Sequence, residues 1–223
     1  YKDYAEWYYS EDYQRSLSLQ KTFWINELKG FKNTAILPAD FKRSNEISFE
    51  GDYANFSIKG KTKEALEKLV KNSETSLFSV LTSLYSVLQF KLTGVDDLAI
   101  GTPVAGRRHW SLDNMIGMFV NTLVIRINPR NEISFNDYLK EVSSKVVQSF
   151  DNQEYPYESL LDDLGSRQSN EMNPLFNTLI TLDNFDQAVV DIDNLEIKSF
   201  EINKSTSKFD LIMHFSEKEN ELA

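Results

Sequence analysis

The chain has 223 residues, 41% of them hydrophobic, and its 24 basic and 34 acidic side chains give a formal net charge of −10. This acidic balance argues against binding to duplex nucleic acid, which requires a clustered basic surface, and no window approaches the run of about 18 apolar residues that spans a bilayer. The absence of cysteine excludes disulfides and thiolate metal sites. We therefore expect a soluble cytoplasmic protein without a metal centre. Because it begins with Tyr1 rather than Met, we also expect it to be part of a longer chain.

Helices dominate the pattern in the first half of the chain. Ser10 is a good N-cap and Gly30 a good stop signal, which predicts a long helix over residues 10–29. The elements expected next are a strand near residues 53–58, an exposed amphipathic helix over 61–72, a helix over 76–92 and a short strand over 97–101. Apolar side chains lie on several sides of the helix at 76–92, which predicts that this helix is buried all round.

The second half is richer in strands. Residues 119–127 alternate as a strand does, with Asn121 on one face and Thr122 and Arg126 on the other. A helix is expected from Ser134, with Asp137 completing a variant of the capping box. The remaining elements are a small helix from residue 156 to 165 and strands over 176–182, 195–202 and 209–215. Helices and strands in this irregular order predict an α/β sandwich around a mixed sheet.

Several short strings occur along the chain in a characteristic order. They are YKDYAEW at residues 1–7, GTPVAGR at 101–107, IGMFVNTLVIR at 116–126, YPYE at 155–158, NPLF at 173–176 and STSKFDL at 205–211. Together they resemble the condensation domains of nonribosomal peptide synthetases. Two positions depart from the family pattern: Asn152 stands where histidine is usual, and Ser169 lies further from Asn173 than the pattern has it.

The resemblance implies a fold similar to that of chloramphenicol acetyltransferase, in which two lobes form a V with a tunnel between them. Family members join two thioester-bound groups, and their catalytic signature H-H-x-x-x-D-G precedes the Y-x-D-Y-A-x-W string. This chain begins at that later string and has no adjacent histidines. We therefore expect residues 1–223 to form the C-terminal lobe, without the N-terminal lobe, without a catalytic residue of its own, and inactive alone.

The resemblance also implies the partners of such a lobe. These are the N-terminal lobe of the same domain, the upstream and downstream peptidyl carrier domains, and an adenylation domain. No cofactor is expected to bind directly, because the carriers deliver the phosphopantetheine arms.

The resemblance suggests Asn121, Thr122 and Arg126 as substrate-binding residues. A polar side chain in a half-buried strand costs free energy unless it has a partner or a task. Asn121 is therefore open to two interpretations, a bond to a crossing backbone or a polar contact in the substrate tunnel. For Arg126, an ion pair with one of the many acids is favoured over a contact with a ligand. Arg107 and Arg108 are weaker candidates for docking a carrier.

Other polar residues favour structural roles. The pairs Asp96-Asp97 and Asp162-Asp163 are expected at solvated ends of elements. His109 and His214 are expected to be structural. GTPVAGR lacks the spacing and lysine of a phosphate-binding loop, so its two glycines, Gly101 and Gly106, are interpreted as allowing tight turns at the end of a strand.

Two alternatives to a peptide-forming lobe stay open. One is the corresponding lobe of an epimerisation or ester-forming domain of the same superfamily. The other is a non-catalytic scaffold or binding module that has kept the fold.

Overall fold

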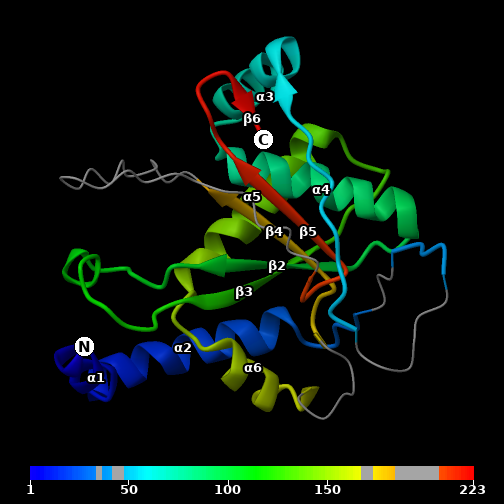
Figure 1. Ribbon diagram of the computed structural model, residues 1–223. Helices are drawn as coiled ribbons and strands as arrows, with labels where there is room; N and C mark the ends of the chain where they lie inside the picture. The colour runs from blue at the N-terminus through cyan, green and yellow to red at the C-terminus, as the bar shows by residue number, and fades with distance from the viewer. Residues whose placement is uncertain (34–36, 42–47, 167–172, 184–205) are drawn as a thin grey trace.

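The computed structural model describes residues 1–33, 37–41, 48–166, 173–183 and 206–223 (Figure 1). The α-helices are α1 (Lys2–Tyr8), α2 (Glu11–Glu27), α3 (Gly60–Asn72), α4 (Leu77–Thr93), α5 (Phe135–Asp151) and α6 (Tyr157–Asp163). The strands are β1 (Ile58–Lys59), β2 (Leu98–Val104), β3 (Asn121–Ile127), β4 (Thr178–Asp183), β5 (Leu211–Ser216) and β6 (Glu221–Leu222). No helix among these residues is long and apolar enough to cross a membrane.

The main sheet has the strand order β3-β2-β4-β5. Strands β2 and β3 are antiparallel, with Leu98 opposite Ile127 and Val104 opposite Asn121, whereas β4 runs parallel to both β2 and β5. The sheet is therefore mixed, and the predicted α/β class is confirmed. A separate antiparallel pair, β1 with β6, lies beside α3.

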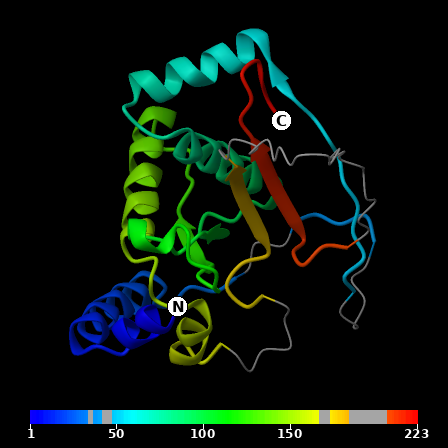
Figure 2. The same cartoon turned by 60° about the vertical axis from the view of Figure 1, so that its left-hand side comes forward.

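Helices cover both faces of this sheet. On one face α4 and α5 pack against it, and Leu81 and Val142 belong to the same buried cluster as Ile100 and Ile180. On the other side α2 and α6 lie together, away from α3 and α4 (Figures 1 and 2). Their cluster joins Trp24 and Leu160 to the sheet residue Val124 and to Phe176 just before β4. The β2–β3 loop extends beyond the sheet on the same side of the molecule as α1 (Figure 1).

The predicted helix starts are confirmed by their caps. The hydroxyl groups of Ser10, Ser76 and Ser134 each accept a hydrogen bond from the backbone N–H three residues further on. The strand predicted near residues 53–58 is wrong in extent, because only Ile58–Lys59 pairs with another strand. Residues 195–202, predicted as a strand, and Ser169 lie outside the described residues.

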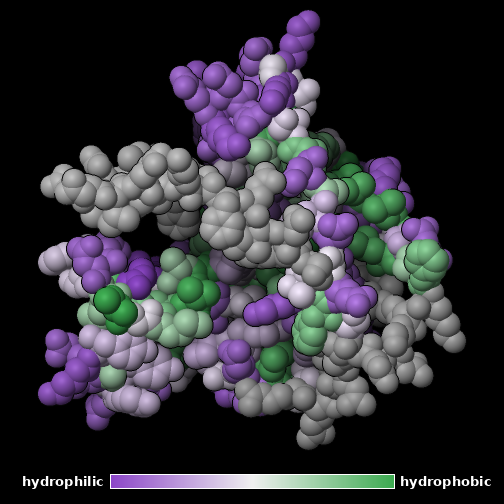
Figure 3. Space-filling view, viewed as in Figure 1, coloured by the Kyte–Doolittle hydropathy of each residue, from purple (hydrophilic) through white to green (hydrophobic). Residues whose placement is uncertain are grey.

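The prediction that α4 is buried all round is also wrong. Leu84, Leu88 and Leu92, four residues apart, form a stripe that is 40–51% exposed, and Figure 3 shows hydrophobic surface over this helix. Small polar residues take much of the buried side instead. Thr82 and Ser83 can be buried because their hydroxyls donate to carbonyls one turn back in the same helix.

Candidate functional site

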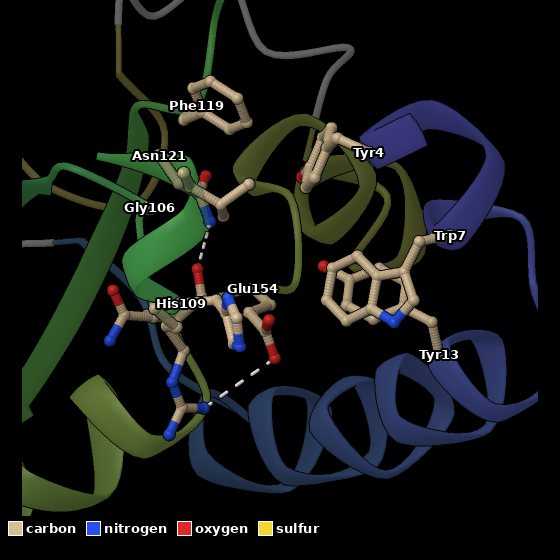
Figure 4. A pocket seen from close by; sticks show the side chains of 11 residues that line it. Tyr4, Trp7, Tyr13, Gly106, His109, Phe119, Asn121 and Glu154 are labelled. Atoms are coloured by element: carbon tan, nitrogen blue, oxygen red, sulfur yellow. Dashed lines mark hydrogen bonds and ion pairs between the residues drawn. The ribbon is translucent and has the colours of Figure 1, made fainter. Parts of the chain in front are cut away.

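Three of the characteristic strings, and the two residues that precede a fourth, meet at one place on the structure. They surround a hollow of about 60 Å³ between α1, α2, the β2–β3 loop and the segment before α6 (Figure 4). Its lining includes Tyr4 and Trp7 of YKDYAEW, Gly106 of GTPVAGR, Phe119 and Asn121 of IGMFVNTLVIR, and Gln153 and Glu154 next to YPYE. The hollow has room for a few water molecules and not for a peptidyl group. We therefore interpret it as a junction between distant elements of the chain, not as a substrate pocket.

Asn121, the first residue of β3, binds the backbone of the segment before α6. Its Nδ2 donates to the carbonyls of Gln153 and Tyr155, each at 2.8 Å, and its Oδ1 accepts from the Tyr157 N–H at 3.1 Å. Both amide hydrogens are thus used. Of the two interpretations of Asn121, the structure shows the bond to a crossing backbone. The tunnel contact stays a prediction.

Helix α2 holds the same segment from another side. Gln20, only 5% exposed, accepts from the N–H groups of Glu154 and Tyr155 at 3.0 and 3.2 Å. Its Nε2 donates to the Glu154 carboxylate at 3.0 Å, and the Trp24 indole donates to the carbonyl of Asn152 at 2.8 Å. We call residues 152–157 the clamped segment, since side chains from β3 and α2 bind its backbone.

The role of Gln20 was not predicted. The signal available in the sequence was its position, because Gln20 lies three residues after Leu17 and four before Trp24, on the apolar face of α2. A polar residue on such a face needs a partner. Its partners lie 134 and 135 positions away, so the pattern could raise the question but not answer it.

The two glycines of GTPVAGR are required for different structural reasons. Gly106 lies beyond the end of β2 with φ +67°, and a Cβ there would lie 1.8 Å from the Phe119 carbonyl oxygen, so this position requires glycine. Gly101 is not at a turn, and that prediction is wrong. It lies inside β2, where a Cβ would come within 2.3 Å of the Phe176 ring. Gly101 is therefore required by the close approach of the NPLF segment.

Aromatic rings connect α1 to the β2–β3 loop. The Phe119 ring lies 4.8 Å from the Tyr4 ring and 5.5 Å from the Tyr1 ring, measured between centroids. Burial raises the pKa of both Tyr4 and Tyr13 above its ordinary value, which already lies well above neutral pH, so two protonated hydroxyls lie beside the Glu154 carboxylate. The YKDYAEW string is thus part of the wall of the hollow.

Arg107 and Arg108 both lie at this junction but differ in how far their side chains are packed against other groups. The Arg107 guanidinium lies 4.3 Å from the centroid of the Phe119 ring and donates to the Leu112 carbonyl. Arg108 donates to the Asp151 carbonyl at 3.0 Å and lies 3.7 Å from the Glu154 carboxylate, with 44% of its side chain exposed. Arg108 therefore retains an exposed surface, whereas Arg107 is packed onto a ring.

Arg126 lies outside the junction. It makes a two-pronged ion pair with Asp97, at 2.8 and 2.7 Å, and donates to the carbonyls of Glu27 and Lys29 at the end of α2. The hydrogen bonds to Asp97 raise the pKa of Arg126 above its ordinary value. This geometry matches the ion-pair interpretation. Thr122 pairs with Pro103 of β2, on the face of β3 opposite to Asn121, and its substrate contact stays a prediction.

The two histidines are distant in sequence and make different local contacts. His109 accepts from the Ser111 N–H at 3.2 Å, which caps the short 3₁₀ helix Trp110–Leu112. His214 on β5 contacts the Thr181 hydroxyl at 2.7 Å and lies 3.5 Å from the Asp183 carboxylate. Within the described ranges, no group of three or more histidine and acidic side chains is placed to hold a metal ion.

Comparisons with known proteins agree on one family. The family model described as "Condensation domain" matches residues 1–223. The chain is 37% identical over 220 residues to bacitracin synthase 3 of Bacillus licheniformis, covering 97% of this chain and 3% of that protein. It is also 37% identical over 220 residues to tyrocidine synthase 3 of Brevibacillus parabrevis, covering 98% of this chain and 3% of that protein. The chain therefore spans only a small part of these relatives.

Solved structures show the same fold at lower identity. The X-domain from teicoplanin biosynthesis superimposes with a TM-score of 0.85 at 19% identity, covering 92% of this chain and 48% of that one. The condensation domain from the Monacolin K polyketide synthase MokA gives a TM-score of 0.70 at 17% identity, covering 92% of this chain and 50% of that one.

Proposed function

Because the chain belongs to the condensation-domain family, we propose that it takes part in peptide bond formation between carrier-bound aminoacyl or peptidyl thioesters. In this role it is part of a nonribosomal peptide synthetase in the cytoplasm. Upstream and downstream carrier domains deliver both substrates on phosphopantetheine arms, and an adenylation domain supplies the activated amino acid. The observation that supports this most is the convergence of four family strings on the hollow and the clamped segment.

We further propose that residues 1–223 act as the C-terminal lobe of the domain. The chain matches 48% and 50% of the two solved proteins above while nearly all of it superimposes, which supports a half-domain. The N-terminal lobe then supplies the catalytic histidine. No catalytic role is proposed for His109 or His214, whose Nδ1 atoms bond to the Ser111 N–H and the Thr181 hydroxyl.

Amine attack on a thioester requires a group that accepts or orients a proton. The role proposed for this lobe is instead to position the groups that line the tunnel. Asn121 is proposed to act by fixing the clamped segment at the tunnel wall, with Thr122 as a further tunnel contact. Arg108, which is exposed, is the stronger of the two carrier-docking candidates. Arg126 is the weakest substrate-binding candidate, because Asp97 and two carbonyls already bind its guanidinium.

The test uses the complete synthetase module that contains this chain, with both carriers loaded. Mass spectrometry of the downstream carrier is expected to show an amide-linked product, and Asn121→Ala is expected to slow its formation in protein that remains folded by circular dichroism. Loaded carriers that yield no product would overturn the proposal.

The same assay separates the related reactions. An ester product with a hydroxyacyl acceptor, and none with an aminoacyl acceptor, would indicate an ester-forming domain. Deuterium exchange at the Cα of the carrier-bound residue without condensation would indicate epimerisation.

A binding module is the second candidate. The fold is similar to that of the X-domain from teicoplanin biosynthesis. A second structure, of that X-domain in complex with OxyB, superimposes on this chain with a TM-score of 0.83. A module that forms no product but captures another protein stoichiometrically would favour this candidate.

A further inference from the structure

Gln20 lies in none of the characteristic strings, yet it makes three hydrogen bonds to the clamped segment. We propose that Gln20 is a positioning residue for condensation, which acts by fixing the clamped segment and the carboxylate of Glu154. This inference rests on the proposed function for its effect on turnover. Its structural part can be tested without any activity.

The first step concerns which backbone groups of the clamped segment each amide side chain binds. Asn121 takes the carbonyls of Gln153 and Tyr155, whereas Gln20 takes the N–H groups of Glu154 and Tyr155. If Gln20 is removed, two neighbouring N–H groups in a part-buried place lose their acceptor, and each unpaired group favours movement of the segment toward water.

The second step concerns charge at the hollow. The Glu154 side chain is only 17% exposed, and its Oε2 lies 3.0 Å from Gln20 Nε2 and 3.7 Å from Arg108. Gln20 therefore binds the backbone and the side chain of the same residue. A carboxylate held in this way faces the hollow shared by the family strings, as Figure 4 shows for Glu154. Loss of Gln20 frees both the segment and this charge.

The third step gives a signature that a packing role would not produce. Gln20→Glu keeps an acceptor for the two N–H groups but places a second carboxyl about 3 Å from Glu154. Two carboxyls at that separation titrate as a pair, in which one pKa is strongly raised, and below that raised value the pair shares one proton. The variant is therefore perturbed at high pH, and its defect is relieved as the pH falls through the raised value, because the shared proton replaces the lost amide donor.

The experiment compares three variants in the complete module. Gln20→Met has a similar volume without hydrogen bonds, Gln20→Glu carries the titratable group, and Gln14→Met is the matched control. Gln14 is exposed on the same helix, and among the described residues its side chain donates to the nearby Tyr8 carbonyl. Product formation on the downstream carrier is measured between about pH 8 and pH 4.5, because the raised pKa of two carboxyls that share a site is about 4.7 in an aspartic-protease dyad, and it is expressed relative to the unmodified module at each pH.

Gln20→Met is expected to lower turnover by roughly 10- to 100-fold at every pH, the size of effect that a misplacement of about 1 Å produces. Gln14→Met is expected to match the unmodified module. Gln20→Glu is expected to be impaired at high pH and to recover several-fold as the pH falls. Unchanged turnover of folded Gln20→Met, or a flat relative profile for Gln20→Glu, would overturn the assignment.

A stability measurement separates this inference from the proposed function. Urea unfolding of the Gln20→Glu protein is followed over the same pH range, and its deficit relative to the unmodified protein is expected to shrink as the pH falls. If the unmodified module makes no peptide while this recovery is seen, the proposed function fails and the contact of residue 20 with Glu154 stands. A pH-independent deficit would show that the two side chains do not face each other.

Discussion

Gly101→Ala is the sharpest test of the packing behind the GTPVAGR string. The new Cβ would lie 2.3 Å from one carbon of the Phe176 ring and 2.6 Å from two others, whereas carbon atoms in contact are about 3.5–4.0 Å apart. The ring is only 1% exposed and is stacked on Phe209 at 5.4 Å. It must therefore shift by more than 1 Å, within a packed cluster.

Overpacking of this kind costs about 1–3 kcal/mol, and the loss of glycine flexibility in a strand returns about 0.5–1 kcal/mol. The difference between the two ranges is about 0–2.5 kcal/mol, and the severe overlap with the buried ring favours its upper part, so we expect Gly101→Ala to lower the free energy of unfolding by roughly 1–2.5 kcal/mol. Phe176→Leu alone is also destabilising, because it leaves a void in the cluster. In the double variant the new methyl group fills part of that void, so the two effects are expected to fall short of their sum by at least about 0.5 kcal/mol.

The assay is urea unfolding of the intact protein for the single and double variants, with equal slopes as the condition for comparing free energies. Additive effects of the two substitutions would show that Gly101 is not required by the Phe176 ring. Full stability of Gly101→Ala would refute the close approach itself.

Two further predictions concern ion pairs. Arg126→Lys keeps the charge but loses the fork that binds Asp97 and two carbonyls, so we expect about 1–3 kcal/mol of destabilisation in thermal unfolding; an unchanged transition would contradict this. Burial acts to raise the pKa of Asp163, but Lys21 and the Tyr155 hydroxyl outweigh it and hold that pKa below its ordinary value. This stabilisation is complete above the unfolded pKa and is lost as the pH falls through the folded one. Lys21→Met should therefore flatten the acid side of the stability profile, and an identical slope would count against the pair.

Local signals in the sequence were enough for the helix starts. Ser10, Ser76 and Ser134 each bind an N–H group three residues away, so that all parts of the signal lie within one turn. Hydrophobic periodicity was less informative for α4. It identified a helix but could not say that Leu84 and Leu88 are exposed, because that depends on which neighbours cover each side.

The sequence by itself thus determined the family, the mixed α/β class and most helix boundaries, since strings, caps and periodicity are properties of neighbouring residues. Only the tertiary structure decided what the polar residues bind. Asn121 meets carbonyls 32 and 34 positions later, and Gln20 meets N–H groups 134 and 135 positions later. A buried amide signals that it needs partners, but the partner depends on how the sheet and helices bring distant backbone together.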